Sequence, residues 1–227
     1  MKILITGSRG FIGRNLIERL KDEHCIVEFV RGNTLDELKD LVRNSDFIYH
    51  LAGCNRTNNE KDFEDVNVGL TRVIVEELEE MNKKSPIVFP SSIQAIIDNP
   101  YGRSKKAAED LLIDYKNRTG AIVYLYRLTH VFGRWAPPNY NSVVATWMYN
   151  AMNGKCLSVW DENRVIELLH IDDVVKEFYK LLSGEIKIRE TFLEVKPTFK
   201  INLLLLAKII ELLCITYADN QRGWKNE

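Results

Sequence analysis

The sequence has no bias toward either charge and has few cysteines. Its 227 residues hold 31 lysines and arginines against 32 aspartates and glutamates, with no basic block. Because nucleic-acid backbones are bound through clustered positive charge, no nucleic-acid partner is expected. The four cysteines are scattered without a C-x-x-C motif, so the sequence predicts neither a metal site nor a disulfide framework.

The sequence also has no long hydrophobic run, and we expect no leader segment. The most apolar stretch, Ile201 to Ile215, is interrupted by Lys208 and Glu211 and is too short to span a bilayer. The opening MKILITG resembles a strand and leaves no room for the regions of a signal peptide. We therefore expect a cytoplasmic protein with no membrane partner. Its 45% of apolar residues are enough for a folded core.

Short β-branched segments alternate with helical segments along the first 133 residues. The expected strands are Lys2–Thr6, Ile26–Val30, Phe47–Leu51, Pro86–Pro90 and Ile122–Leu128, and the expected helices are 11–20, 34–42, 65–81 and 100–116. Thr34 followed by Glu37 is the pattern of a capping box at a helix start. Strands separated by helices indicate parallel βαβ units with right-handed crossovers. The expected fold is α/β, a Rossmann-type doubly wound parallel sheet.

The pattern changes after Gly133, where the run PPNYNS precedes a further helix to about Gly154. Residues 184–200 are expected to be irregular, and an amphipathic helix is expected from Ile201 to Leu213. We therefore predict a dinucleotide-binding core over residues 1–133. Residues 134–227 are predicted to form a small C-terminal substrate-binding lobe, interleaved with the core.

A glycine-rich loop follows the first strand and opens the first helix. It reads Thr6-Gly7-Ser8-Arg9-Gly10-Phe11-Ile12-Gly13, a T-G-x-x-G-x-x-G pattern. Glycines permit a tight turn and a close approach of the backbone to a pyrophosphate, which then lies against the start of the helix. The strand-turn-helix context favours dinucleotide binding. The alternative is a glycine turn that serves only the packing of strand and helix.

The end of the second strand indicates which dinucleotide is bound. Folds that bind NAD usually place an acidic residue there, on the ribose hydroxyls. This chain has Arg31, and Arg9 lies in the glycine loop. Two guanidinium groups can form charge-assisted hydrogen bonds to a 2′-phosphate, which favours NADP(H) over NAD. The alternative is that both are solvated surface arginines.

A third group of residues, Tyr101-Gly102-Arg103-Ser104-Lys105, follows a strand that ends in Ser91 and Ser92. Tyr101 and Lys105 are four residues apart and share a helix face, so the ammonium can lower the pKa of the phenol and poise it for proton transfer. The preceding strand ends where open α/β sheets bind ligands. The alternative is a core tyrosine beside a solvated lysine.

With these motifs the sequence resembles the extended short-chain dehydrogenases/reductases, or NAD-dependent epimerase/dehydratase family, over residues 1 to about 215. The resemblance rests on TGSRGFIG, HLAG, NVGLT with Asn67, SSIQA, YGRSK, the R-x-x-x-V-F-G run from Arg127 and ELLHIDDVV. It is closer still to the bacterial capsule and O-antigen reductases of UDP-N-acetyl-L-fucosamine biosynthesis, through HLAGCNR, SSIQAIIDNPYGRSK and FGRWAPPNYNSVVAT.

The resemblance implies NADPH-dependent reduction of the 4-keto group of a UDP-linked 2-acetamido-2,6-dideoxy sugar. It makes Tyr101 the general acid, has Lys105 hold the nicotinamide ribose, and has Ser92 bind the substrate carbonyl. It implies that the pyrophosphate is bound by Gly7, Gly10, Phe11, Ile12 and Gly13. It also implies that the adenosine half of the cofactor lies along Leu51, Ala52 and Gly53. His130, Asn139 and Asn141 would contact the nucleotide sugar.

The chain departs from that family at three points. His130 replaces the usual Asn, and Pro90 replaces the first serine of the usual triple. The 227 residues end where the family continues into a metal-binding cupin domain that epimerises the sugar, so epimerisation is not assigned to these residues. The expected partners are a UDP-sugar and either a second copy of the chain or a separate cupin epimerase. His50 is expected to be a core or cofactor-proximal residue, and His170 to cap a sheet edge.

Two other functions stay open. One is a redox-neutral nucleotide-sugar epimerase or dehydratase with bound NAD, which Arg31 disfavours. The other is a non-catalytic dinucleotide-sensing protein, which has no need of Ser92, Tyr101 and Lys105.

Overall fold

The computed structural model of the chain describes residues 1–184 and 190–223. These residues form two compact units. The first comprises Met1–Leu128 and Asp172–Val195, and the second comprises Thr129–Ile171 and the chain from Lys196 onward. The segment Asp172–Val195 thus belongs to the first unit, although in the sequence it lies between the two segments of the second unit.

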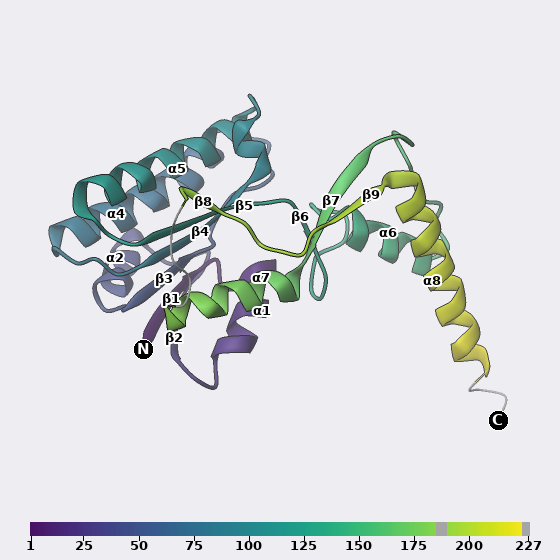
Figure 1. Cartoon of the computed structure of the whole chain (residues 1–227), viewed down its shortest axis with the longest axis horizontal. Helices are drawn as coiled ribbons and strands as arrows, with labels where there is room; N and C mark the ends of the chain where they lie inside the picture. Colours follow the sequence, from purple (N-terminus) through teal and green to yellow (C-terminus); the bar gives the residue numbers. More distant parts are fainter. Residues whose placement is uncertain (185–189, 224–227) are drawn as a thin grey trace. The chain divides into compact units, whose positions relative to one another are not determined.

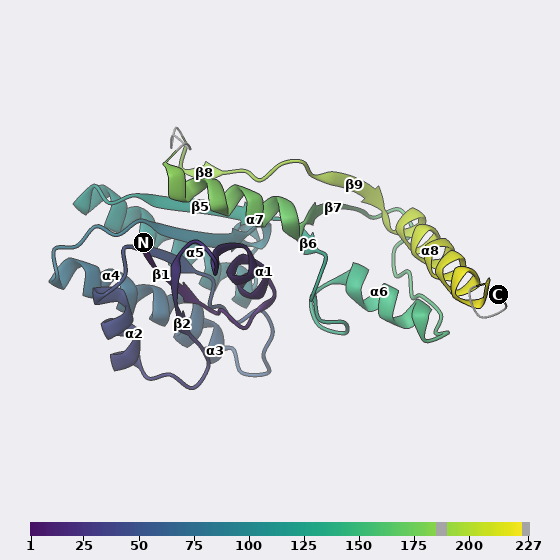
Figure 2. The same ribbon diagram turned by 90° about the horizontal axis from the view of Figure 1, so that it is seen from below.

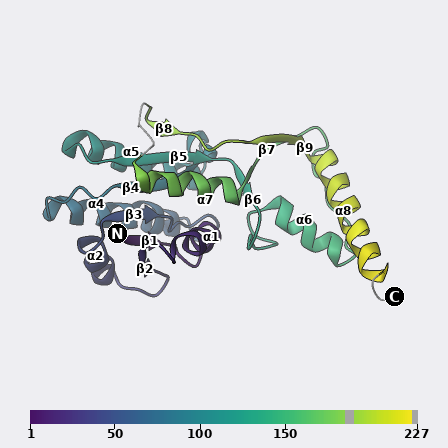
Figure 3. The same cartoon turned by 60° about the horizontal axis from the view of Figure 1, so that its bottom comes forward.

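The first unit is built on a six-stranded sheet whose neighbouring strands are all parallel. Across the sheet the strands are β2 (Cys25–Phe29), β1 (Lys2–Thr6), β3 (Phe47–His50), β4 (Ile87–Ser92), β5 (Val123–Leu128) and β8 (Phe192–Leu193). Figure 3 shows β2 and β8 at opposite edges. Because the chain moves from β1 to one side for β2 and to the other for β3, the topological switch point lies between β1 and β3. Ligands of such sheets bind at this point, beyond the carboxyl ends of the strands.

Helices cover both faces of this sheet (Figure 1). One face carries α2 (Leu35–Arg43), α4 (Leu70–Glu80) and α5 (Pro100–Thr119), and the other carries α1 (Phe11–Leu20) and α7 (Ile171–Lys180). The first face is sealed by a buried apolar cluster that includes Leu38, Ile74 and Leu112. On the second face the Tyr49 hydroxyl donates to the Phe178 carbonyl at 2.7 Å. Helices on both faces of a parallel sheet confirm the predicted doubly wound α/β fold.

Four short helical segments complete the first unit: α3 (Lys61–Phe63), the π-helix η1 (Glu64–Gly69), and the 3₁₀ helices η2 (Ile93–Ile96) and η3 (Leu181–Ser183). The π-helix η1 and α4 together occupy the segment predicted as one helix over residues 65–81. A single helical turn with π geometry commonly marks a functional region, because it shifts the backbone hydrogen bonds of the helix.

Side-chain caps explain where two of the helices begin. The predicted capping box is confirmed, since the Glu37 amide donates to Thr34 Oγ1 at 3.2 Å and the Thr34 amide donates to the Glu37 carboxylate at 2.5 Å. At the start of α5 the Asn99 side chain accepts from the Gly102 amide at 2.7 Å. Pro100 at the first helical position fixes φ where no amide partner is needed.

The second unit contains the three-stranded sheet β6 (His130–Phe132), β7 (Val165–His170) and β9 (Phe199–Asn202), with helices α6 (Val143–Met152) and α8 (Leu203–Gly223). In this sheet β6 and β7 pair in parallel, and β7 and β9 pair antiparallel, side by side in Figure 2. Its core includes Trp147, Leu206 and Ile210. No helix in the described parts of the chain is long and apolar enough to cross a membrane.

Several predictions for the second half of the chain are wrong. Strand β8 and the beginning of β9 lie in the segment predicted to be irregular, of which residues 185–189 are outside the described residues. Helix α8 begins at Leu203 and continues to Gly223. Both strands are short and pair with partners distant in sequence, so no local pattern marks them.

Candidate active site

The glycine loop packs tightly against the segment that follows β3. Gly7 has φ +66°, and a Cβ atom built on it would lie 2.7 Å from the Ala52 amide nitrogen. A Cβ on Gly13, in the first turn of α1, would lie 2.5 Å from the Gly7 carbonyl oxygen. The glycines at these two positions are therefore required for packing. This close approach also brings the loop after β1 and the segment after β3 together at the switch point of the sheet.

The N-terminus of α1 suits an anion. Its N-cap residue is Gly10, which offers no side-chain cap, and the first turn holds no acidic residue. The amides of Phe11 and Ile12 thus begin a ten-residue helix at its positive dipole end. This geometry fits the pyrophosphate of a dinucleotide. The loop is therefore suited to bind a dinucleotide in addition to packing the strand against the helix.

Arg9 and Arg31 are both exposed. Within the described residues, no carboxylate forms an ion pair with either of them. Burial raises the pKa of the Cys54 thiol, and the charge of Arg31 acts against that rise. Arg31 therefore lies within electrostatic reach of the segment after β3. Both arginines are available to an anionic ligand at this edge of the sheet.

Strand β4, the turn η2 and helix α5 position Ser92, Tyr101 and Lys105. Ser92 ends β4, and its hydroxyl oxygen accepts from the Gln94 amide at 3.1 Å. Tyr101 lies in the first turn of α5, with its ring 5.9 Å from the ring of Phe63. One turn later the Lys105 ammonium donates to the Pro90 carbonyl at 3.0 Å. The bond from Lys105 anchors this face of α5 to the end of β4, two residues before Ser92.

Lys105 is a buried cation. Its side chain is packed over the Phe89 ring, with Nζ 3.9 Å from the ring centroid, and the residue is only 5% exposed. Burial lowers the pKa of Lys105 to about 7, and the negative charge of Glu109 acts in the opposite direction. Glu109 is itself fully buried and forms a bidentate pair with Arg127 at 3.0 and 2.7 Å. Glu109 therefore supports the charged form of Lys105.

The buried side chain of Asn67 holds the segment after β3. Its Oδ1 accepts from the Cys54 amide at 2.8 Å, and its Nδ2 donates to the Cys54 carbonyl at 3.0 Å. Nδ2 also donates to the Ser104 hydroxyl at 2.9 Å, and that hydroxyl donates to the Tyr101 carbonyl at 2.8 Å. The side-chain amide of Asn67 thus connects two parts of the predicted site. One is the segment after β3 that was predicted to bind adenosine, and the other is the first turn of α5, which was predicted to be catalytic.

Three of the four residues predicted to contact the substrate lie in the second unit, and the fourth, Ser92, lies in the first. His130 is in β6, where its Nδ1 donates to the Glu167 carbonyl at 3.2 Å. Asn139 has a left-handed backbone with φ +56°, and its amide donates to Thr146 Oγ1 at 2.9 Å. Asn141 is exposed in the turn before α6. Their role as substrate ligands stays a prediction.

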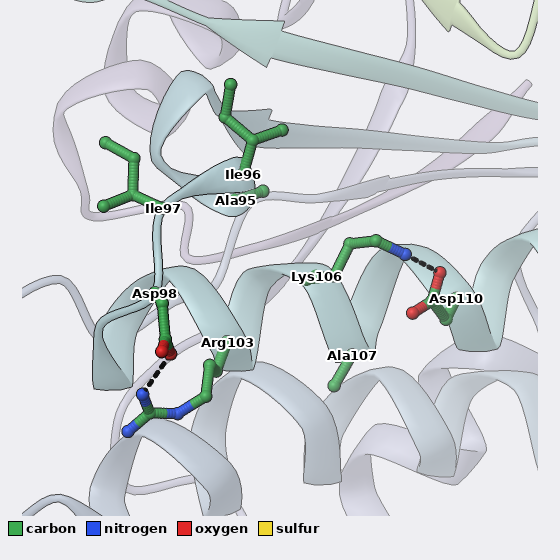
Figure 4. A pocket seen from close by; sticks show the side chains of 8 residues that line it. All are labelled: Ala95, Ile96, Ile97, Asp98, Arg103, Lys106, Ala107 and Asp110. Carbon is green, nitrogen blue, oxygen red and sulfur yellow. Dashed lines mark hydrogen bonds and ion pairs between the residues drawn. The ribbon is translucent and has the colours of Figure 1, made fainter.

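A shallow pocket of about 330 Å³ lies between η2 and α5 (Figure 4). Its lining includes none of the residues predicted for catalysis. The cations at its rim are already paired, Arg103 with Asp98 and Lys106 with Asp110. Nowhere in the described residues do three or more metal-ligating side chains cluster.

Two features of the site were not predicted from the sequence. Glu109 follows Lys105 by four residues, so a helical pattern of Tyr, Lys and Glu at successive fourth positions could have indicated one shared face. The partners of His50, which are Thr6 and Thr71, lie 44 and 21 residues away from it. No local pattern in the sequence links them.

The family model described as the NAD dependent epimerase/dehydratase family matches residues 3–192. The chain belongs to this family. A curated relative from Pseudomonas aeruginosa, UDP-2-acetamido-2,6-beta-L-arabino-hexul-4-ose reductase, is 40% identical over 205 residues, which are 89% of this chain and 55% of the relative. The chain therefore spans little more than half the length of that family member.

Solved structures agree with this membership. The capsular polysaccharide assembling protein CapF from Staphylococcus aureus matches with a TM-score of 0.85 and 37% identity, over 96% of this chain and 60% of that one. UDP-glucuronic acid 4-epimerase from Bacillus cereus, solved in complex with NAD, matches with a TM-score of 0.79 and 18% identity, over 90% of this chain and 81% of that one. The second likeness shows the fold alone.

Proposed function

We propose that this chain reduces the 4-keto group of a UDP-linked 2-acetamido-2,6-dideoxy sugar, with NADPH as the reductant, in the synthesis of a bacterial surface polysaccharide. The observation that carries the proposal is the placement of Tyr101 and the buried Lys105 one turn apart on α5, with Lys105 bonded to the end of the strand that carries Ser92. The name of the 40% identical relative supports the substrate class.

The residues at the switch point fit a dinucleotide. The uncapped start of α1 would hold the pyrophosphate through the Phe11 and Ile12 amides, and the segment Leu51–Gly53 would lie along the adenosine. Lys105 would bond to the ribose next to the nicotinamide. When bound, NADPH supplies a hydride to the carbonyl carbon.

The chain's own residues then manage the charge that develops on the carbonyl oxygen. Ser92 donates a hydrogen bond to that oxygen and orients it. Tyr101 donates its phenolic proton to the same oxygen, so the product is a neutral alcohol. The Lys105 ammonium stabilises the phenolate that remains, and Glu109 favours the charged form of Lys105.

A substrate panel tests this function. The protein is incubated with NADPH and a set of UDP-linked 4-keto sugars, and the products are identified by mass spectrometry and NMR. We expect NADPH to be consumed in a one-to-one ratio with a 2-acetamido-2,6-dideoxy 4-keto sugar. A redox-neutral epimerase or dehydratase would convert the sugar without net consumption, and a sensing protein would bind the cofactor without turnover.

The preference for NADPH is proposed from Arg31 and Arg9. Each charge-assisted hydrogen bond to the 2′-phosphate contributes roughly 1.5–3 kcal/mol, so NADPH should bind at least about tenfold tighter than NADH. Arg31→Asp should abolish or invert the preference because a carboxylate repels the phosphate. Lys84→Asp, at an exposed position before β4 and therefore at the opposite end of the strands, is the matched control for the change in net charge. Equal affinities of the unmodified protein for the two cofactors would contradict the assignment.

A further inference from the structure

His50 is a buried histidine for which the proposed reaction has no use. It ends β3 at the switch point of the sheet and is 1% exposed. Its Nδ1 lies 2.8 Å from Thr6 Oγ1, and its Nε2 lies 3.0 Å from Thr71 Oγ1. Both threonines are fully buried. Burial lowers the pKa of His50 to about 3, and the positive charge of Lys105 adds to the effect, so the ring is neutral.

The partners of the two threonines determine which nitrogen carries the proton. Thr71 donates its hydroxyl hydrogen to the Asn67 carbonyl at 2.7 Å, and a carbonyl can only accept. Thr71 Oγ1 must therefore accept from His50, which requires hydrogen on Nε2. A neutral ring has one N–H, so Nδ1 is bare and accepts from the Thr6 hydroxyl. Thr6 Oγ1 in turn accepts from the Ala52 amide at 3.0 Å.

The result is one continuous chain of four hydrogen bonds with a single direction. It runs from the Ala52 N–H through Thr6, His50 and Thr71 to the Asn67 carbonyl. Hydrogen bonds aligned in this way polarise one another and strengthen the chain. With the hydrogen on Nδ1 instead, bare Nε2 and the Thr71 hydroxyl oxygen would face each other as two acceptors, and the Thr6 hydroxyl hydrogen would lose its acceptor. The Asn67 carbonyl therefore fixes the tautomer of His50. This tautomer in turn orients the Thr6 hydroxyl so that its oxygen accepts from the Ala52 amide.

Both ends of the chain act on the segment from Leu51 to Cys54. At one end Thr6 holds the Ala52 amide, whose nitrogen is the atom that limits the space beside Gly7. At the other end the side chain of Asn67 holds the amide and the carbonyl of Cys54. The segment is thus fixed at two points by hydrogen bonds within the chain.

We propose that His50 is a positioning residue for the dinucleotide site, whose single Nε2–H tautomer holds Leu51–Cys54 in the shape that receives the adenosine half of the cofactor. The proposal rests on the proposed function, because it takes this segment as part of the cofactor site. It differs from a purely structural role of His50, which would affect folding stability and leave cofactor affinity unchanged.

The test replaces Thr71 by Val, which has the same shape and no hydroxyl, and uses Thr71→Ser as the matched control that keeps the hydroxyl. Without an acceptor for Nε2–H, the tautomer of His50 is released and the Thr6 to Ala52 bond loses its support. We expect ¹⁵N NMR of the ligand-free protein to show His50 changing from one tautomer to a mixture. We expect NADPH, titrated by fluorescence, to bind roughly 5- to 30-fold more weakly, the equivalent of one buried hydrogen bond. Thr71→Ser should restore both.

Two outcomes contradict the proposal. One is an unchanged His50 tautomer in Thr71→Val, and the other is a changed tautomer with unchanged NADPH affinity. If Thr71→Val does not fold, Thr6→Val with Thr6→Ser as its control poses the same question from the other end of the chain, again with affinity as the readout. If the unmodified protein binds neither NADPH nor NADH, the proposed function is overturned. If it binds NADPH and the variants bind NADPH equally well, only the proposed role of His50 is overturned.

Discussion

Tyr101 has one chemical task in the proposed reaction, which is to supply a proton from its hydroxyl group. Tyr101→Phe keeps the ring and its contact with Phe63 and removes that proton donor. We expect the rate of reduction to fall at least about 100-fold, the usual contribution of a positioned acid, with NADPH affinity retained. Steady-state kinetics together with a binding titration check this. Near-normal turnover in Tyr101→Phe would rule out the assignment of the acid.

Burial of the Lys105 ammonium, which the proposed reaction requires, lowers the stability of the fold. Its pKa is lowered from 10.5 to about 7 because burial removes the solvation of the ammonium. Between these two values the unfolded chain binds more protons than the folded protein, so the stability of the fold rises with pH across this window. The full cost of burying the charge is present below about pH 7.

Lys105→Met removes this cost and keeps the length of the side chain. We expect the variant to be inactive and more stable than the parent at about pH 7, by roughly 2–4 kcal/mol, with the difference shrinking toward about pH 9.5. Urea unfolding of both proteins at the two pH values measures this. A constant difference at both pH values would mean that Lys105 does not titrate in this range.

The placement of individual residues could be predicted only where it follows a local spacing. Tyr101 and Lys105 are four residues apart, and α5 places them in successive turns as expected. The hydrogen-bonded chain through His50 joins β1, β3, η1 and α4. The sequence therefore indicated a core or cofactor-proximal histidine, but the tautomer and its partners depend on tertiary packing.

Among the elements, α5 is tied to the sheet by a buried ion pair. The Glu109 carboxylate on α5 pairs with Arg127 on β5, and the Arg127 guanidinium lies 3.9 Å from the centroid of the Phe192 ring on β8. The pair therefore connects the helix that carries Tyr101 with two strands. Breaking such a pair from one side leaves a buried charge without compensation.

Arg127→Met should therefore lower the free energy of unfolding by about 3–5 kcal/mol. The double variant with Glu109→Gln should lose less than the sum of the two single variants, because neither charge is left alone. Arg118→Met, which breaks exposed contacts of the same helix, is the control and should cost at most about 1 kcal/mol. Additive losses at Glu109 and Arg127, measured by urea unfolding, would show that the pair is not coupled.

Elements with strong local signals were predicted to within a few residues, and those without them were missed. The Thr34 to Glu37 capping box and Pro100 mark helix starts that the structure confirms. Strand β8 has two residues and joins the sheet through its pairing with β5, which is more than 60 positions earlier in the chain. Its position is set by partners that a sequence window does not contain.

At the scale of the whole molecule, the residues predicted from the sequence to act in the reaction are divided between two units. The first unit holds the dinucleotide loop and the catalytic turn, and the second holds His130, Asn139 and Asn141. The fold of the first unit followed from the alternation of strands and helices. The second unit combines segments 129–171 and 196 onward around a β7–β9 pair, and this combination depends on contacts between distant segments.

Hydride transfer to a defined carbon is the central claim of this account, and isotope labelling measures it directly. The protein is mixed with NADPH carrying deuterium at the transferable position of the nicotinamide and with a UDP-linked 2-acetamido-2,6-dideoxy 4-keto sugar, and the product is examined by NMR and mass spectrometry. The account predicts one deuterium per molecule at C4 of the sugar and an equal amount of oxidised cofactor. A converted sugar without deuterium at C4 would contradict it.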